Sequence, residues 1–155
     1  TPLGCLKILD YYNINVEGKD VVVIGRSNIV GKPISSLLSQ NFSYGNATVT
    51  LCHTRTKDLS LYTKKADIII AAVGVPNLVN RDMIKKGAHI IDVGINRIED
   101  NSREKGYRVV GDVNFNDVLG KAASITPVPG GVGVMTVTML LSNTVEATFN
   151  QTKKE

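Results

Sequence analysis

The sequence predicts an α/β fold: a doubly wound, mostly parallel sheet with helices on both of its faces. Two observations support this prediction. Short apolar runs rich in valine and isoleucine alternate along the chain with segments of helical periodicity, as in successive β-α-β units. These runs are nearly continuous, which is typical of strands that are covered on both faces. Because β-α-β crossovers share one hand, the strands should lie parallel in one sheet.

The predicted elements begin with a helix near 2–13, where Thr1 can cap the helix and Pro2 fits its first turn. An extended piece is expected at 107–110 and a polar tail at 151–155, and the charged stretch 100–106 is the best candidate for disorder. The other elements are strands at 20–25, 47–52, 67–73, 88–93 and 123–126, and helices at 31–41, 58–65, 80–86 and 135–149.

The most informative segment is the turn between the first strand and the helix after it, residues 25–33, Gly-Arg-Ser-Asn-Ile-Val-Gly-Lys-Pro. Gly25 allows backbone torsions or a close approach that a Cβ would prevent, and Gly31 would let the helix pack tightly on the strand. The free N–H groups at the start of that helix favour a phosphate. The segment is typical of a Rossmann-type nucleotide site, although its glycine spacing differs from G-x-G-x-x-G.

Ligands of open α/β sheets bind beyond the carboxyl ends of the strands. A single glycine at such an end would indicate only a turn. Four of the five predicted ends contain glycine, and their agreement along one sheet edge predicts a flat ligand lying against the backbone. The five ends are 25–27, 53–55, 73–76, 94–96 and 127–133.

The end of the second strand bears on the choice of cofactor. An NAD site usually places Asp or Glu there to bind the ribose hydroxyls. This chain has Thr54 and Arg55 instead, with Arg26 in the preceding glycine turn. Guanidinium groups bind phosphate through paired donors, so the prediction is NADP rather than NAD. Arg55 taken alone would fit an exposed loop residue equally well.

The segment 25–33 resembles the cofactor loop of the methylene-tetrahydrofolate dehydrogenase/cyclohydrolase family. The segment 126–136, Thr-Pro-Val-Pro-Gly-Gly-Val-Gly-Val-Met-Thr, resembles that family's other signature, and Gly-Ile-Asn at 94–96 and Gly-Asp-Val at 111–113 stand between them. The resemblance runs from Thr1 to about Phe149. It implies that the turn before the last helix lies on the folate side of a cleft. Val134 stands where the family usually has proline.

The strand ends and this resemblance together define two sets of candidate residues. The candidate cofactor-binding residues are Gly25, Arg26, Ser27, Thr54, Arg55 and Ile95. The candidate substrate-binding residues are Pro129, Gly130, Gly131, Val132 and Gly133.

The resemblance also implies a function. Residues 1–155 match the NAD(P)-binding domain of an enzyme that oxidises methylene-tetrahydrofolate with NADP and then hydrolyses the methenyl product. The family's catalytic Tyr-x-x-x-Lys belongs to an N-terminal domain that is absent from this chain. We therefore assign no catalytic residue, expect the chain alone to be inactive, and expect the parent to be a homodimer whose two domains share the folate substrate. The alternative is a stand-alone nucleotide-binding or regulatory module. About 120 or more residues encoded before Thr1 would favour the enzyme.

Composition bears on the expected partners and on the cellular compartment of the protein. The formal net charge is +4, but the basic residues are scattered and aromatic residues make up 5%, so no nucleic-acid partner is expected. No apolar run approaches the roughly 20 residues of a membrane span, so no membrane contact is expected. Cys5 and Cys52 are far apart in the chain, which argues against a disulfide or zinc site. They favour a reducing compartment, the cytoplasm in the first instance, with an organelle left open.

The remaining polar residues show no nucleophile, carboxylate-pair or metal pattern. His53 and His89 are expected to be packed or hydrogen-bonded rather than catalytic. Asp112 is expected to cap a helix that begins soon after it. Asp92 is expected to orient the backbone near Gly94.

Overall fold

A computed structural model describes residues 1–153 and contains one five-stranded parallel sheet. The strand order is β2-β1-β3-β4-β7, and all four neighbouring pairs are parallel. The chain moves from β1 to β2 in one direction and then crosses back to β3, which places a topological switch point between β1 and β3. The strands are β1 (Asp20–Ile24), β2 (Thr48–Cys52), β3 (Ile68–Ala71), β4 (His89–Asp92) and β7 (Ser124–Ile125).

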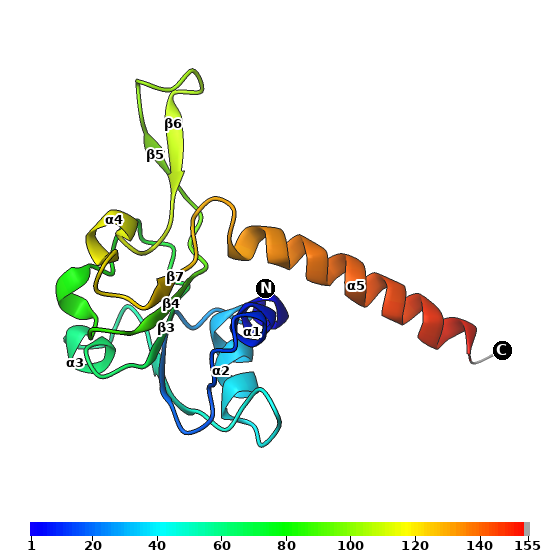
Figure 1. Ribbon diagram of the computed structural model, residues 1–155. Helices are drawn as coiled ribbons and strands as arrows, with labels where there is room; N and C mark the ends of the chain where they lie inside the picture. Colours follow the sequence, from blue (N-terminus) through cyan, green and yellow to red (C-terminus); the bar gives the residue numbers. More distant parts are fainter. Residues whose placement is uncertain (154–155) are drawn as a thin grey trace.

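Side chains of the sheet enter two separate cores, one on each face. Val21 and Val23 of β1 belong to the core under α1 and α2, whereas Val22 and Ile24 belong to the opposite core. This division follows from the period of two along a strand. The sheet is therefore doubly wound with helices on both faces, as predicted (Figure 1).

The helices differ in how well the sequence predicted them. Helices α1 and α2 lie within the predicted ranges, and α3 covers only the middle of its predicted range. The predicted helix at 80–86 is reduced to a single 3-10 turn, η1, in which the Asn80 side chain accepts from the Asp82 N–H. The bounds are α1 (Pro2–Tyr11), α2 (Gly31–Ser39), α3 (Ser60–Thr63), η1 (Arg81–Met83) and α4 (Phe115–Val118).

A β-hairpin projects from the body of the molecule between β4 and α4 (Figure 1). Its strands β5 (Asn96–Glu99) and β6 (Tyr107–Val110) pair antiparallel. The extended piece at 107–110 is confirmed, whereas its partner strand was not predicted. The stretch expected to be disordered forms the hairpin turn, in which the Asp100 N–H donates to the carbonyl of Gly106 at 2.9 Å.

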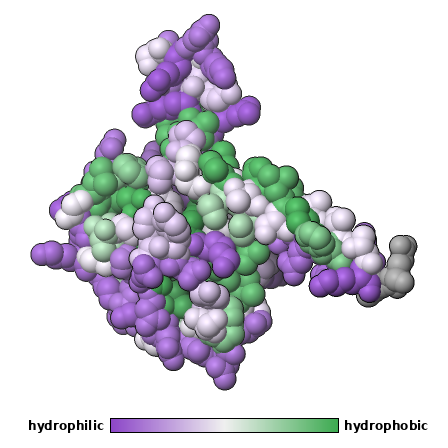
Figure 2. Space-filling model, turned by 45° about the vertical axis from the view of Figure 1, so that its right-hand side comes forward, coloured by the Kyte–Doolittle hydropathy of each residue, from purple (hydrophilic) through white to green (hydrophobic). Residues whose placement is uncertain are grey.

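Helix α5 (Val132–Thr152) begins three residues earlier than predicted and extends away from the sheet (Figure 1). Its Val137, Leu140, Leu141 and Val145 are all more than half exposed. Figure 2 shows the resulting apolar band along the helix. Contrary to the expectation from the sequence, α5 is long and apolar enough to span a membrane by length and composition alone. A single helix of this kind is weak evidence for a membrane span.

Candidate functional site

The carboxyl ends of four strands lie at one level along the sheet edge. The register pairs Ile24 with Cys52 on one side and with Ala71 on the other, and Ala71 pairs with Asp92. The loops that follow these residues therefore lie side by side. They are the segments predicted from the sequence as strand ends, so the sheet brings the first four of these segments together in the order β2, β1, β3, β4.

The first loop depends on two glycines in close contact with backbone. Gly25 has φ of 118°, and a Cβ there would overlap the carbonyl oxygen of Ala72, the residue directly after β3. A Cβ on Gly31 would overlap the carbonyl oxygen of Gly25. A larger residue at Gly25 would separate the loop after β1 from the loop after β3, and one at Gly31 would push the first turn of α2 away from the loop after β1. The close approach expected at both glycines is confirmed.

Ser27 closes the start of α2 from within the loop. Its Oγ accepts hydrogen bonds from the N–H groups of Val30 at 3.1 Å and Gly31 at 3.3 Å. The hydroxyl thus satisfies two amides that were expected from the sequence to be free for a phosphate. A ligand at this turn has the hydroxyl hydrogen of Ser27 and the amides before Val30 as its remaining donors.

The candidate residues after β1 and β2 are neighbours. The Gly25 N–H donates to the carbonyl of Cys52 at 2.9 Å. Arg26 comes directly after Gly25, and Thr54 and Arg55 come soon after Cys52, so this hydrogen bond brings the two loops together. All three side chains are exposed. Within residues 1–153, neither arginine forms an ion pair. Two cationic groups without a protein anion beside a glycine turn leave room for an anionic ligand.

The remaining candidates line a cavity of about 210 Å³ at the other end of the sheet edge. Ile95 forms one side, and the turn before α5 forms the other with Pro129, Gly130, Gly131, Val132 and Gly133. A Cβ on Gly131 would overlap the carbonyl oxygen of Pro127, so this turn also requires a close backbone approach. Val134 lines the same cavity from the first turn of α5, where its N–H donates to the carbonyl of Gly131 at 3.2 Å.

Both histidines form hydrogen bonds, as expected from the sequence. Nδ1 of His53 accepts from the N–H of Arg55 at 3.1 Å and shapes the turn after β2. Nδ1 of His89 lies 2.8 Å from Oγ of Ser124, and burial lowers the pKa of this imidazole. No group of three potential metal ligands occurs among the described residues.

The expected helix cap at Asp112 is wrong. The residue before α4 is Asn114, and the Asp112 carboxylate instead accepts hydrogen bonds from the N–H groups of Val73 and Gly74 in the loop after β3. The expected role of Asp92 agrees with the structure, because its Oδ1 accepts from the N–H of Gly94 at 3.0 Å. The Gly-Asp-Val pattern at 111–113 was the available sign that Asp112 lies at a site rather than in a plain cap.

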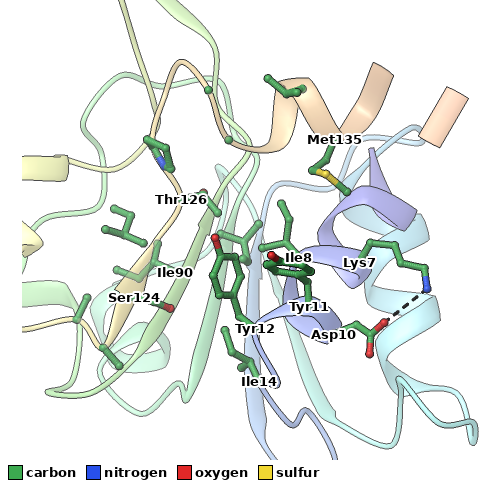
Figure 3. Close-up of a pocket in the computed structure, with 18 of the residues that line it drawn as sticks. Lys7, Ile8, Asp10, Tyr11, Tyr12, Ile14, Ile90, Ser124, Thr126 and Met135 are labelled. Atoms are coloured by element: carbon green, nitrogen blue, oxygen red, sulfur yellow. Dashed lines mark ion pairs between the residues drawn. The ribbon is translucent and has the colours of Figure 1, made fainter. Parts of the chain in front are cut away.

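A cavity of about 840 Å³ lies on the sheet face between α1 and the start of α5, and Gly130 and Gly131 of the glycine-rich turn also line it. Figure 3 shows Tyr11 and Tyr12 from the end of α1 on one side, and Ile90 of β4 with Ser124 and Thr126 from β7 and the residue after it on the other. Its lining is mostly apolar, and the ion pair drawn there joins Lys7 and Asp10 at 3.5 Å on α1. Such a groove has the character of a surface that packs against another protein element rather than of a reaction centre.

The glycine turn lies beside the switch point of an open parallel sheet, where proteins of this architecture bind dinucleotides at the carboxyl edge. The fold and the site define a nucleotide-binding domain of the Rossmann type. Residues 1–152 match the family described as "Tetrahydrofolate dehydrogenase/cyclohydrolase, NAD(P)-binding domain". The chain belongs to this family.

Individual relatives agree with the family match. The bifunctional protein FolD of Chloroherpeton thalassium is 56% identical over 147 residues, which are 95% of this chain and 50% of that protein. The crystal structure of the bifunctional enzyme FolD, methylenetetrahydrofolate dehydrogenase/cyclohydrolase, from Campylobacter jejuni has a TM-score of 0.87 and 53% identity, with 97% of this chain and 50% of that one covered.

The corresponding enzyme of Trypanosoma brucei, solved with NADP cofactor and an inhibitor, has a TM-score of 0.85 and 43% identity. The match covers 93% of this chain and 48% of that one. The chain spans about half the length of the relatives it matches.

Proposed function

We propose that this chain is the NADP-binding half of a bifunctional methylene-tetrahydrofolate dehydrogenase and methenyl-tetrahydrofolate cyclohydrolase. The observation that carries the proposal is the line of backbone-lined loops along the sheet edge, which runs from the exposed arginines after β1 and β2 to a glycine-rich cavity. Neighbouring strands are about 4.8 Å apart. The five-strand edge is therefore long enough for an extended dinucleotide.

The proposed orientation puts the adenosine end of NADP at β1 and β2. Arg26, Thr54 and Arg55 offer charge and hydroxyl donors there, and no carboxylate is present at the end of β2 to bind ribose hydroxyls. A guanidinium matches a phosphate through paired donors. The relative from Trypanosoma brucei binds NADP, and this supports the same choice of cofactor here.

The nicotinamide and folate end then lies at the cavity beside Ile95. The turn 129–133 forms one wall for the folate, and the N-terminal half of the parent supplies the opposite wall and the acid–base group. In this arrangement the chain holds the cofactor and aims it, while the proton is moved by the other half. The reaction is the transfer of a hydride from the methylene carbon to nicotinamide, followed by hydrolysis of the methenyl product.

The apolar band of α5 and the groove beside α1 are the surfaces available for the other half and for a second copy in a homodimer. Thr1 lies beside this region, because its Oγ1 is 3.0 Å from Oγ1 of Thr136 on α5. Both cysteines are free and buried, which fits a reducing compartment such as the cytoplasm.

The proposal is tested by titration calorimetry of the 155-residue chain with NADP and with NAD. We expect tighter binding of NADP. Arg26→Ala should weaken NADP binding roughly tenfold to a hundredfold and leave NAD binding largely unchanged, because one charge-assisted contact to phosphate contributes about 1.5–3 kcal/mol.

Lys65→Ala is the matched control, since it removes one exposed positive charge just before β3, at the opposite end of this strand from the candidate site. Equal affinity of the wild type for both cofactors contradicts the assignment of NADP. If Arg26→Ala weakens the binding of both cofactors equally, Arg26 contacts the pyrophosphate that NAD and NADP share.

A further inference from the structure

Two carboxylates are buried side by side where the hairpin joins the sheet. Asp92, the last residue of β4, is 2% exposed, and Asp112, two residues after β6, is fully buried. Neither forms an ion pair with a described lysine or arginine. Buried carboxylates without a cation must be stabilised by hydrogen-bond donors. The donors here are nearly all backbone N–H groups of the loops at the candidate site.

Asp112 holds the loop after β3. Its Oδ2 accepts from the N–H of Val73 at 2.7 Å and from the N–H of Gly74 at 2.9 Å. Its Oδ1 accepts from Nδ2 of Asn96 at 2.8 Å, in the first residue of β5. One side chain therefore ties the switch-point loop to the base of the hairpin.

Asp92 holds the loop after β4 and also holds Asp112 itself. Its Oδ1 accepts from the N–H groups of Gly94 at 3.0 Å and Asp112 at 2.9 Å, and its Oδ2 accepts from the N–H of Val113 at 3.0 Å. Its own N–H donates to Oγ1 of Thr126 at 2.8 Å, directly before the glycine-rich turn. Asp92 also lines the cavity that contains Ile95.

Two glycines make room for these carboxylates in a reciprocal arrangement. A Cβ on Gly94, two residues after Asp92, would overlap the carboxylate of Asp112. A Cβ on Gly111, one residue before Asp112, would overlap the carboxylate of Asp92. Each aspartate thus occupies the space that a glycine next to the other aspartate leaves open. The pair of motifs forms one interlocked unit.

We propose that Asp92 and Asp112 are positioning residues for the cofactor: they fix the backbone of the loops after β3 and β4 in the conformation that accepts the dinucleotide. This rests on the proposed binding of NADP at the sheet edge. Neither carboxylate needs to touch the ligand. They act through the amides of Val73, Gly74 and Gly94, which would move if their acceptors were lost.

The hydrogen-bond geometry distinguishes the two aspartates. In Asp112→Asn the amide oxygen can still accept from Val73 and Gly74, and the new NH2 group can donate to Asn96 once the Asn96 amide turns over. In Asp92→Asn both oxygen positions face backbone N–H groups, which cannot turn over. Either orientation of the amide then sets a donor against a donor.

The test measures NADP affinity of the two asparagine variants by calorimetry, at a temperature where circular dichroism shows each to be folded. Asp92→Asn should weaken NADP binding at least tenfold, whereas Asp112→Asn should stay within threefold of the wild type. Asp112→Ala removes the acceptor for Val73 and Gly74 without adding a donor, and it should also lose at least tenfold.

Ile84→Ala is the control for destabilisation alone. Ile84 is buried in the core on the sheet face opposite α1 and α2, so its truncation should lower the melting temperature and leave the dissociation constant of NADP unchanged. A purely structural role for the aspartates would give the same pattern in their variants.

Wild-type binding of NADP together with an unchanged affinity in folded Asp92→Asn or Asp112→Ala overturns the proposal. A wild type that binds no NADP overturns the proposed function instead. The wild type also offers a measurement that needs no variant. Saturating NADP should slow amide hydrogen exchange at Val73, Gly74, Asp112 and Val113, and unchanged exchange at all four would contradict the positioning role.

Discussion

Individual residues at the sheet edge are constrained more by backbone than by other side chains. At Gly25 and at Gly31, a backbone carbonyl oxygen lies so close that it would overlap a Cβ. This could be predicted, because glycines in the turn from a buried strand to a helix are typical of a close approach between backbone segments. The role of Asp112 could not be predicted. Its partners Val73 and Gly74 lie 38 or more positions away, and only the folded sheet brings them together.

Asp67 supplies a residue-scale prediction for pH. Its carboxylate accepts from Nζ of Lys85 and from the N–H of Asp20 at 2.9 Å. These donors, the Lys85 hydrogen bond first, lower the pKa of Asp67 below its ordinary value of 3.8. A carboxylate with a lowered pKa stabilises the fold fully above its unfolded pKa and loses this contribution as the pH falls through the folded pKa.

Asp67→Asn should therefore lower the free energy of unfolding at pH 7, by about 1 kcal/mol or less because the pair is partly exposed. The difference from the wild type should shrink as the pH falls below the ordinary pKa of 3.8. Urea unfolding of both proteins from neutral pH down to about pH 3 measures it. If the difference in free energy of unfolding instead grows as the pH falls, the Asp67 carboxylate does not stabilise the fold in the way proposed.

At the scale of elements, the core strands were predictable and the peripheral elements were not. The strand β3 consists of fully buried residues in one apolar run, so its position follows from composition alone. The strand β5 carries Arg97 and Glu99 and gains its partner across a seven-residue turn, so no apolar pattern marks it. Helix α5 was recognised but begun too late, because its first turn contains glycine and follows a segment rich in proline and glycine.

The contrast between α2 and α5 gives a prediction about stability. Leu38 on α2 is fully buried, whereas Leu141 on α5 is 64% exposed. Leu38→Ala should cost about 2–5 kcal/mol, because it removes buried contacts and leaves a cavity. Leu141→Ala should change the stability of this chain by no more than about 0.5 kcal/mol. Urea denaturation of the two variants makes the comparison, and an equal loss for both would mean that α5 is packed in the isolated chain.

At the scale of the whole molecule, the buried and exposed apolar surfaces have different meanings. Both faces of the sheet bury apolar side chains in cores formed by the described residues. The band along α5 and the groove beside α1 are exposed here, and the relatives are about twice as long. The sequence could not predict these surfaces, because apolar positions at helical spacing look the same whether they face a core or another domain.

The central claim is that NADP lies along the carboxyl edge of the sheet, from the arginines near β2 to the cavity beside Ile95. Mapping of backbone amide chemical shifts in the isotope-labelled chain during an NADP titration tests it most directly. We predict changes at Gly25, Arg26, Thr54, Gly74 and Ile95, with Tyr11, Tyr12 and Ser124 of the groove beside α1 unaffected. Changes centred on Tyr11, Tyr12 and Ser124, or none along the strand ends, would contradict it.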